Sequence, residues 1–138
     1  MVVVQVDFNS RHNFVSSKLL PSKDECVHEK IEAKVVPFHF DDFTHVQVNY
    51  EVPLILRGRN AKPTPMFPFA AYVISRERVP HFPYQRIILG AEFMERYAVS
   101  MFGTTDEGQI YFEDDHKTVY AQSFEKKRAD SWAYPLKQ

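Results

Sequence analysis

One aspartate in the chain stands where it could do acid-base chemistry. Asp7 comes directly after the apolar run VVVQV, residues 2–6, and before the polar stretch FNSRHN. A carboxylate that a strand delivers to a loop can transfer protons as a general acid or base, and it can also close a turn by accepting backbone N–H groups. From the local pattern we favour the turn role, and we keep the acid-base role as the alternative.

A second group of residues has the chemistry of metal ligands. It consists of His39, Asp41, Asp42 and His45. Imidazole and carboxylate groups bind zinc, but only where they converge on one point. In two alternating strands the histidines meet on one face only if the strand pairing brings them together. We therefore interpret this segment as a solvated hairpin, and we expect no metal and no cofactor.

The nucleophilic side chains lack the partners that would activate them. Cys26 is the only cysteine, so no disulfide can form within the chain, which fits a reducing compartment. His28 shares a strand face with Cys26, but no further cysteine completes a structural zinc site. Ser16 and Ser17 have no paired base in the sequence. We interpret Cys26 as a structural thiol and the two serines as turn residues.

Size and charge narrow the class of protein. A chain of 138 residues, of which 44% are hydrophobic, suits a single domain. Lys and Arg number 17 while Asp and Glu number 18, so the net charge of -1 gives no general attraction to nucleic acid. MVVVQV lacks a cationic leader, and no run approaches the roughly 20 apolar residues of a membrane span. We expect an intracellular protein, cytoplasmic or nuclear, with no nucleic-acid or membrane partner.

The elements that must position Asp7 are predicted to be β-strands. The chain holds 12 Phe, 7 Tyr and 9 Pro, a composition that favours strands and interrupts long helices. Strands are predicted at residues 2–6, 30–40, 45–56 and 67–74. The segment DDFTHV is predicted to join the second and third of these strands into a hairpin.

Alternation of apolar and polar residues supports two of these strands. In the strand at 30–40, the apolar residues Ile31, Ala33 and Val35 alternate with charged ones. In the next strand the alternating apolar residues are Val46, Val48, Tyr50 and Val52. This alternation is typical of a strand with one buried face.

A short helix is predicted within RIILGAEFMERYAVSMF, after an apolar run and a glycine. Phe93, Met94 and Tyr97 fall at helical spacing and would share one buried face. The opposite side would hold the charged residues Glu92, Glu95 and Arg96. Further strands are predicted in QIYF and TVYAQSF.

The last residues of the chain are predicted to lie outside the domain. A domain at residues 1–124 would be followed by EKKRADSWAYPLKQ, residues 125–138, as a charged tail that could dock on a partner. Trp132, Tyr134 and Leu136 are the large apolar residues of this tail. Either they form a partner-binding strip or they pack back on the domain. Trp132 and Tyr134 are therefore candidate binding residues.

Two separated motifs together resemble a known family. VQVDFNSRHNFVSSKLL resembles the active-site segment of retropepsin-like aspartic proteases, especially those of gypsy-type retrotransposons, and the stretch from His12 to Ser16 keeps the family's pattern. FAAYVISRERVPHFPYQRIILGAEFMERYAV looks like the family's closing half, and GQIYF is similar to its next strand. The resemblance covers about residues 2–112. It implies an all-β, closed barrel with one short helix after the Ile-Leu-Gly run.

The resemblance also implies a reaction and an assembly. An aspartic protease places two aspartates about 3 Å apart, where they share one proton and activate a water molecule between them. A chain with one such aspartate must dimerise to supply the second. Asp7 occupies the position that corresponds to this aspartate.

Two neighbours of Asp7 depart from the family's pattern. Phe8 stands where the family has Thr or Ser, whose hydroxyl is said to brace the two loops across the dimer. Asn9 stands where the family has Gly, which permits a close backbone approach that a Cβ obstructs. Together the changes argue against catalysis, so Asp7 is interpreted as a vestigial catalytic residue. Phe8 and Asn9 become candidate binding residues.

Two further departures concern the segments around this loop. The hairpin that resembles the family's flap has Asp41, Asp42 and Phe43 at its tip, where family flaps carry glycine, so closure over a substrate would be harder. These three residues are candidate binding residues. Only six residues precede Asp7, so either an N-terminal hairpin is missing from this fragment or the fold has dispensed with it. This argues against the family's usual dimer sheet of interleaved termini.

The sequence therefore predicts a non-catalytic retropepsin-like domain that serves as a homodimerisation or protein-protein interaction module in an intracellular complex. Binding would use a two-fold contact around the Asp7 loops, or added-strand hydrogen bonds to an extended segment of a partner. The alternative is an active aspartic endopeptidase that uses the Asp-Phe-Asn loop in a homodimer. A third possibility is a heterodimer in which another chain supplies an intact loop.

Overall fold

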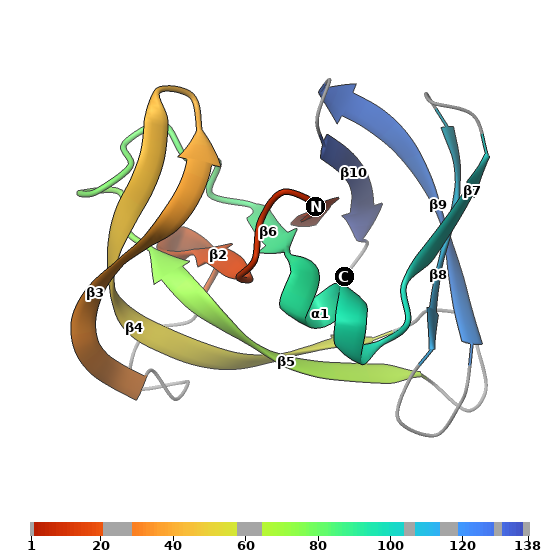
Figure 1. Ribbon diagram of the computed structural model, residues 1–138, viewed down its shortest axis with the longest axis horizontal. Helices are drawn as coiled ribbons and strands as arrows, with labels where there is room; N and C mark the ends of the chain where they lie inside the picture. Colours follow the sequence, from red (N-terminus) through yellow and green to blue (C-terminus); the bar gives the residue numbers. More distant parts are fainter. Residues whose placement is uncertain are drawn as a thin grey trace.

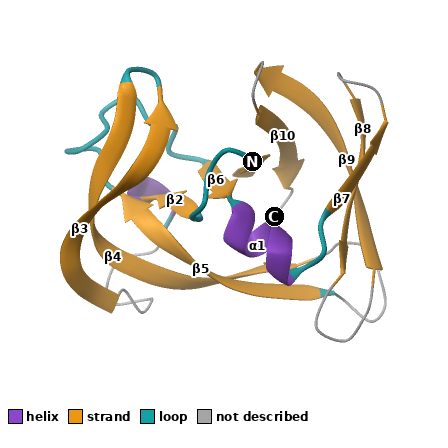
Figure 2. Cartoon of the chain, in the orientation of Figure 1, coloured by secondary structure: helices purple, strands orange, loops and turns teal. Residues whose placement is uncertain are grey.

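The computed structural model describes residues 2–20, 29–57, 65–103, 107–113, 119–128 and 131–136 (Figure 1). These residues are mostly in strands, with one short α-helix and one turn of 3-10 helix (Figure 2). The strands are β1 (Val2–Val6), β2 (Phe14–Ser16), β3 (Glu29–Phe40), β4 (Phe43–Arg57), β5 (Met66–Ile74), β6 (Arg86–Leu89), β7 (Ser100–Gly103), β8 (Glu107–Glu113), β9 (Val119–Arg128) and β10 (Ser131–Leu136). The helices are η1 (Ser17–Leu19) and α1 (Ala91–Arg96). The predicted all-β character is confirmed.

The described strands form one open sheet. Their order is β3-β4-β5-β2-β6-β1-β10-β9-β8-β7. Closure into a barrel would require β3 to pair with β7, and these strands stand at opposite ends of the order and on opposite sides of the molecule (Figure 1). The predicted closed barrel is therefore wrong. No helix among the described residues is long and apolar enough to cross a membrane.

The sheet is mixed, with its parallel pairs at the centre. β1 runs parallel to β6, and β2 runs parallel to β5, while β2 and β6 are antiparallel to each other. On its other side β1 pairs antiparallel with β10, over all five of its residues. Both edges of β1 are therefore occupied within the chain.

The predicted hairpin between β3 and β4 is confirmed. Asp41 and Asp42 form its turn, and Asp41 has a φ of 49°, a left-handed conformation that Asp tolerates. In β4 the predicted alternation holds, because Val46, Val48 and Val52 are buried. Tyr50 on the same side is half-buried.

The buried face of β3 differs from the one that its alternation indicates. Val35 is 66% exposed and Ala33 is exposed. The core instead receives the next residues of opposite parity, Val36, Phe38 and Phe40. Between Lys30 and Lys34 the register with β4 shifts, so the start of β3 carries extra residues that have no counterpart on its partner. Such a bulge is not visible in a pattern of alternation.

Two hydrophobic clusters lie on opposite faces of the central strands. In β6, Ile87 and Leu89 enter the first cluster, whereas Ile88 between them enters the second. In β2, Val15 enters the first cluster and Phe14 the second. Since side chains alternate along a strand, the clusters must flank the sheet. The central strands are buried on both sides, which explains their continuous apolar runs.

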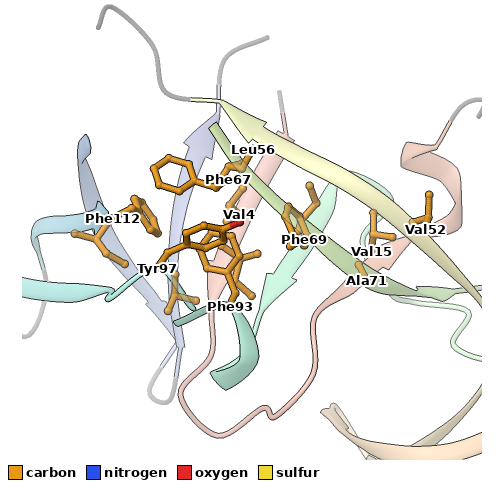
Figure 3. Close-up of a cluster of buried hydrophobic side chains, with 14 residues drawn as sticks. Val4, Val15, Val52, Leu56, Phe67, Phe69, Ala71, Phe93, Tyr97 and Phe112 are labelled. Carbon is orange, nitrogen blue, oxygen red and sulfur yellow. The ribbon is translucent and has the colours of Figure 1, made fainter. Parts of the chain in front are cut away.

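The helix α1 packs on the first cluster as predicted. Phe93 and Tyr97 are fully buried, and Met94 is half-buried against the same cluster. Glu92, Glu95 and Arg96 are exposed. Figure 3 shows Phe93 and Tyr97 among Phe67, Phe69 and Phe112, and the rings of Phe93 and Tyr97 lie 4.8 Å apart between centroids. Contacts of this kind add about 0.5–1.5 kcal/mol to the burial of the rings.

The C-terminal segment is part of the sheet. The boundary predicted between residues 124 and 125 lies inside β9, and residues 131–136 form β10 between β1 and β9. In the backbone, Trp132 is the partner of Val6 and Tyr134 is the partner of Val4. The charged composition of residues 125–138 does not indicate a strand. The partner of this strand, β1, lies at the other end of the chain, so a local pattern cannot indicate the pairing.

Candidate functional site

The loop that follows β1, residues 7–13, is the candidate functional site, and we call it the Asp7 loop. β1 and β6 run side by side in parallel, with Val6 opposite Leu89. The backbone N–H of Asp7 donates to the Leu89 carbonyl over 3.0 Å. The Asp7 loop thus starts at the C-terminal ends of two adjacent parallel strands, which is where ligand-contacting loops of such sheets commonly lie.

Asp7 closes a turn within this loop. Its side chain is buried, with 8% of the residue exposed, and Oδ1 accepts the backbone N–H of Asn9 over 2.9 Å. The N–H of Ser10 donates to the Asp7 carbonyl over 3.2 Å. A carboxylate that binds the N–H two residues on is an Asx turn. The turn role predicted for Asp7 is confirmed.

The end of the Asp7 loop supports the start of α1. The N–H groups of Ala91 and Glu92 donate to the carbonyls of Ser10 and Arg11 over 2.8 and 3.1 Å. The first N–H groups of a helix have no partner inside the helix, so the loop takes the place of a capping side chain. Gly90 at the N-cap has no side chain with which to cap the helix itself.

Asn13 joins the loop to β5 and to the N-cap of α1, a role that the sequence did not reveal. It is 4% exposed, and its Oδ1 accepts the N–H of Gly90 over 2.9 Å. Its Nδ2 donates to the Ala70 carbonyl over 3.2 Å, and its own carbonyl accepts the N–H of Tyr72 over 2.9 Å. The only indication in the sequence that Asn13 has a special role is its place in the His-Asn-Phe pattern. That pattern does not indicate which groups Asn13 binds.

Gly90 fits against the loop because it lacks a Cβ. A Cβ at this position would fall within 2.7 Å of the Ser10 carbonyl oxygen and would collide with the carbonyl of His12. Both obstacles are backbone atoms, which cannot rotate away as a side chain can. The close approach of β6 to the Asp7 loop therefore depends on glycine.

The outer part of the loop faces solvent. Phe8 is 52% exposed and Asn9 is exposed, whereas Asp7 and Asn13 are buried. Large apolar rings usually lie in the core, so Phe8 is an apolar group on the solvent-facing side of a loop that hydrogen bonds hold in place. Trp132 is placed near the same end of β1 by its backbone pairing with Val6.

A polar group borders the loop on the side of α1. His12 Nδ1 lies 3.1 Å from Glu92 Oε1, and the His12 ring meets the Tyr72 ring edge-on at 5.2 Å. Lys34 Nζ lies 4.7 Å from the centre of the same Tyr72 ring. The Tyr72 hydroxyl, with smaller contributions from Glu51 and Glu92, raises the pKa of Lys34.

The turn of the β3–β4 hairpin is exposed, but the end of β3 directly before the turn is packed. Asp41, Asp42 and Phe43 are exposed, and Phe43 is 37% exposed. Below them, the rings of Phe38 and Phe40 lie 5.6 and 5.3 Å from the ring of Phe82. In Figure 1 the tip stands at the upper left, away from α1. The predicted binding residues of the tip and of the Asp7 loop thus lie on separate elements.

The residues that the sequence analysis considered as metal ligands, His39, Asp41, Asp42 and His45, do not come together around one point. Among the described residues there is no group of three or more His, Cys, Asp or Glu side chains that could hold a metal ion. His45 instead contacts its neighbour, with 3.0 Å between His45 Nδ1 and Thr44 Oγ1. Cys26 and His28 lie outside the described residues.

Comparisons with known proteins found no relative of this chain. No protein-family model, no curated protein and no solved structure matches the chain. The functional interpretation therefore depends on the residues of the Asp7 loop and on the elements that hold it.

Proposed function

We propose that this chain is a retropepsin-like domain that binds a protein partner and does not cut it, with the Asp7 loop as the contact surface. Two features support the family reading. The elements follow the order that the resemblance implies, from the strand before Asp7 to the short helix after the Ile-Leu-Gly run. The N–H of Asp7 also donates to the carbonyl of Leu89, the last residue of β6 and the Leu of the Ile-Leu-Gly run.

The observation that carries the proposal is the contrast between Asp7 and Phe8. The carboxylate of Asp7 is buried and already accepts a backbone N–H, while the neighbouring ring of Phe8 is 52% exposed. A catalytic loop would present its carboxylate to the substrate, whereas this loop presents an aromatic ring. Exposed aromatic residues in rigid settings contribute most to protein-protein contacts.

Two further features support binding over catalysis. Each chain has one aspartate at this position, so a second copy would have to bring its Asp7 to about 3 Å past two phenylalanine rings. In the hairpin that resembles a flap, Phe38 and Phe40 at the turn end of β3 pack on Phe82. A hairpin held in this way is poorly suited to open and close over a substrate.

The partner that the loop could recognise most directly is a second copy of the chain. Because both edges of β1 are occupied within the chain, β1 has no free edge for a strand of another molecule. A two-fold contact at this end of the molecule would therefore consist of loops, with Phe8 of each copy near the axis. Binding of an extended segment of another protein remains the second form of this proposal.

The test compares Phe8→Ser with Tyr84→Ser in sedimentation equilibrium. Tyr84 is the matched control because it is an aromatic residue with 64% exposure on a different loop. We expect the wild-type chain to exceed its monomer mass of 16.2 kDa at high concentration, and we expect Phe8→Ser to weaken this association more than Tyr84→Ser. Equal behaviour of the two variants would refute Phe8 as the contact.

An active aspartic endopeptidase is the second candidate, because Asp7 is fixed in position as a catalytic carboxyl must be. The two candidates make opposite predictions for a general peptide library at about pH 4 to 6, where paired carboxyls share a proton. We expect no cleavage by the wild-type chain. Cleavage that disappears in Asp7→Asn would establish the protease and refute our proposal.

A further inference from the structure

The outer face of β4 and β5 carries an exposed apolar stripe. In the register of these strands Pro53 is opposite Ala70, Ile55 is opposite Pro68, and Arg57 is opposite Met66. Opposite residues lie on the same face, and so do residues two apart along a strand. Ile55 is 47% exposed and Met66 is 42% exposed. We call Pro53, Ile55, Met66, Pro68 and Ala70 the β4–β5 stripe.

The stripe is the uncovered part of a face that is buried further along. Tyr72 and Ile74 continue it on β5, and both are buried in the second hydrophobic cluster. The opposite face of the same ribbon holds Phe67 and Phe69, which pack with Phe93 of α1 in the first cluster. Figure 1 shows β4 and β5 as a long ribbon along the lower border of the molecule, with α1 above it. The stripe therefore faces away from α1.

The two ends of the stripe carry opposite charges. Arg57 is exposed at the end near Met66. Glu51 stands at the other end, opposite Tyr72, six residues from Arg57 and on the same face. At about 3.3 Å per residue, the two charges are roughly 20 Å apart. An apolar centre between an acidic end and a basic end is self-complementary when a second stripe is turned end for end.

Other charged groups near the ends leave this polarity in place. The pKa of Lys34 is raised chiefly by the Tyr72 side chain, with smaller contributions from the carboxylates of Glu51 and Glu92, so Lys34 is a cation near the Glu51 end. Near the middle of the ribbon, Arg96 Nη1 donates to the Pro68 carbonyl over 3.0 Å. Among the described residues of β4 and β5 that share the stripe's face, Glu51 and Arg57 are the charged ones.

We propose that a second copy of this chain docks on the β4–β5 stripe through a two-fold contact. The rotation axis passes midway between Pro53 and Ile55, so each Glu51 meets the Arg57 of the other copy. The apolar residues pack at the centre and the charged pairs form the rim, which is the usual composition of a protein interface. A two-fold contact uses each pair twice and is complete with two chains.

This inference concerns a surface that the Asp7 loop does not share. The Asp7 loop lies at the end of β1, between β1 and β2, whereas the stripe lies on β4 and β5 before the residues that pair with β2. The two proposed contacts can therefore be tested with separate substitutions. Substitutions on one surface serve as controls for the other.

Charge reversal gives the sharpest test, read out as the dimer dissociation constant in sedimentation equilibrium at low salt. We expect Arg57→Glu and Glu51→Arg each to raise this constant about tenfold or more, because each change acts twice in a two-fold contact. The double variant Glu51→Arg with Arg57→Glu restores the charge pairing. We expect it to return to within about threefold of the wild-type constant, as for coupled residues in a double-mutant cycle.

A second pair of variants separates the apolar contact from general effects of charge. Ile55→Asp should abolish the dimer, whereas Val35→Asp should leave it unchanged, because Val35 is 66% exposed on β3, outside the stripe. Far-ultraviolet circular dichroism and thermal unfolding establish that each variant is folded. If Ile55→Asp does not fold, the charge-reversal variants test the contact instead. Each of these variants replaces one exposed or half-buried polar group by another.

The outcomes distinguish the two contacts. In one outcome, Ile55→Asp and the single charge reversals weaken the dimer and Phe8→Ser does not. This outcome supports the stripe and refutes self-association through Phe8. A dimer that only Phe8→Ser weakens supports the Asp7 loop and overturns the stripe. A wild-type chain that stays at 16.2 kDa up to its solubility limit overturns the stripe as well.

Discussion

At the scale of single residues, Gly90 and Asn13 determine where the Asp7 loop lies. Asn13 uses its side-chain oxygen for the Gly90 N–H and its side-chain nitrogen for the Ala70 carbonyl. Gly90 leaves room for the carbonyls of Ser10 and His12. The position of Asp7 and the exposure of Phe8 thus depend on two buried residues.

Gly90→Ala is predicted to destabilise the protein because its new methyl group would collide with backbone carbonyls of the loop. We expect the free energy of unfolding in urea to fall by about 1–3 kcal/mol, as for overpacking elsewhere. Ala98→Gly is the contrasting control, since Ala98 has a φ of 47° that glycine adopts without strain. Its stability should stay equal or rise. A Gly90→Ala variant as stable as the wild type would contradict the close approach.

At the scale of elements, an aromatic contact connects the β3–β4 hairpin to the rest of the molecule. Phe82, on the loop between β5 and β6, is 5% exposed and touches both Phe38 and Phe40 of β3. Phe14 of β2 also meets Phe38, with 4.9 Å between ring centroids. The hairpin is therefore attached to the body of the molecule by its aromatic side as well as by its pairing with β5.

Phe82→Ala is predicted to free the hairpin from the body. The loss of a buried ring should lower the free energy of unfolding by about 3–5 kcal/mol. Amide hydrogen exchange of residues 36–48 should accelerate more than exchange in β1 and β6, because the hairpin loses its anchor directly. Tyr84→Ala removes an exposed ring from the same loop and should change neither quantity. Uniform acceleration in all strands would show that the hairpin does not move separately.

At the scale of the whole molecule, β10 holds the two parts of the sheet together. It lies between β1 and β9 in the strand order, so the path from β1 to β7, β8 and β9 runs through β10. β1 pairs with β10 over its full length, from Val2 opposite Leu136 to Val6 opposite Trp132. The segment predicted as a tail is the strand that links the halves.

Removal of residues 131–138 is therefore predicted to unfold the domain. The truncated chain loses the only strand that joins β1 to β9 among the described strands. This loss should cost about 5 kcal/mol or more, which is comparable to the stability of a typical domain. Thermal unfolding followed by circular dichroism should show no cooperative transition. Removal of residues 137 and 138 alone is the control, and a cooperative transition in the longer truncation would refute the linking role of β10.

How much of this could be predicted depends on the distance along the chain between the residues involved. The spacing of Phe93 and Tyr97 predicts α1, and the carboxylate of Asp7 predicts a turn, because both signals are local. The role of Asn13 could not be predicted, since the Ala70 carbonyl lies 57 residues away in sequence. The resemblance implied a closed barrel, but closure depends on which strands meet at the ends of the sheet.

The extra residues at the start of β3 have a consequence for solubility. β3 is a terminal strand of an open sheet, and such a strand offers backbone groups on which further chains can add and grow into aggregates. The register shift between Lys30 and Lys34 breaks the straight edge that a new strand would need, and Pro37 has no N–H to offer it. These two features make the edge of β3 a poor template for a further strand.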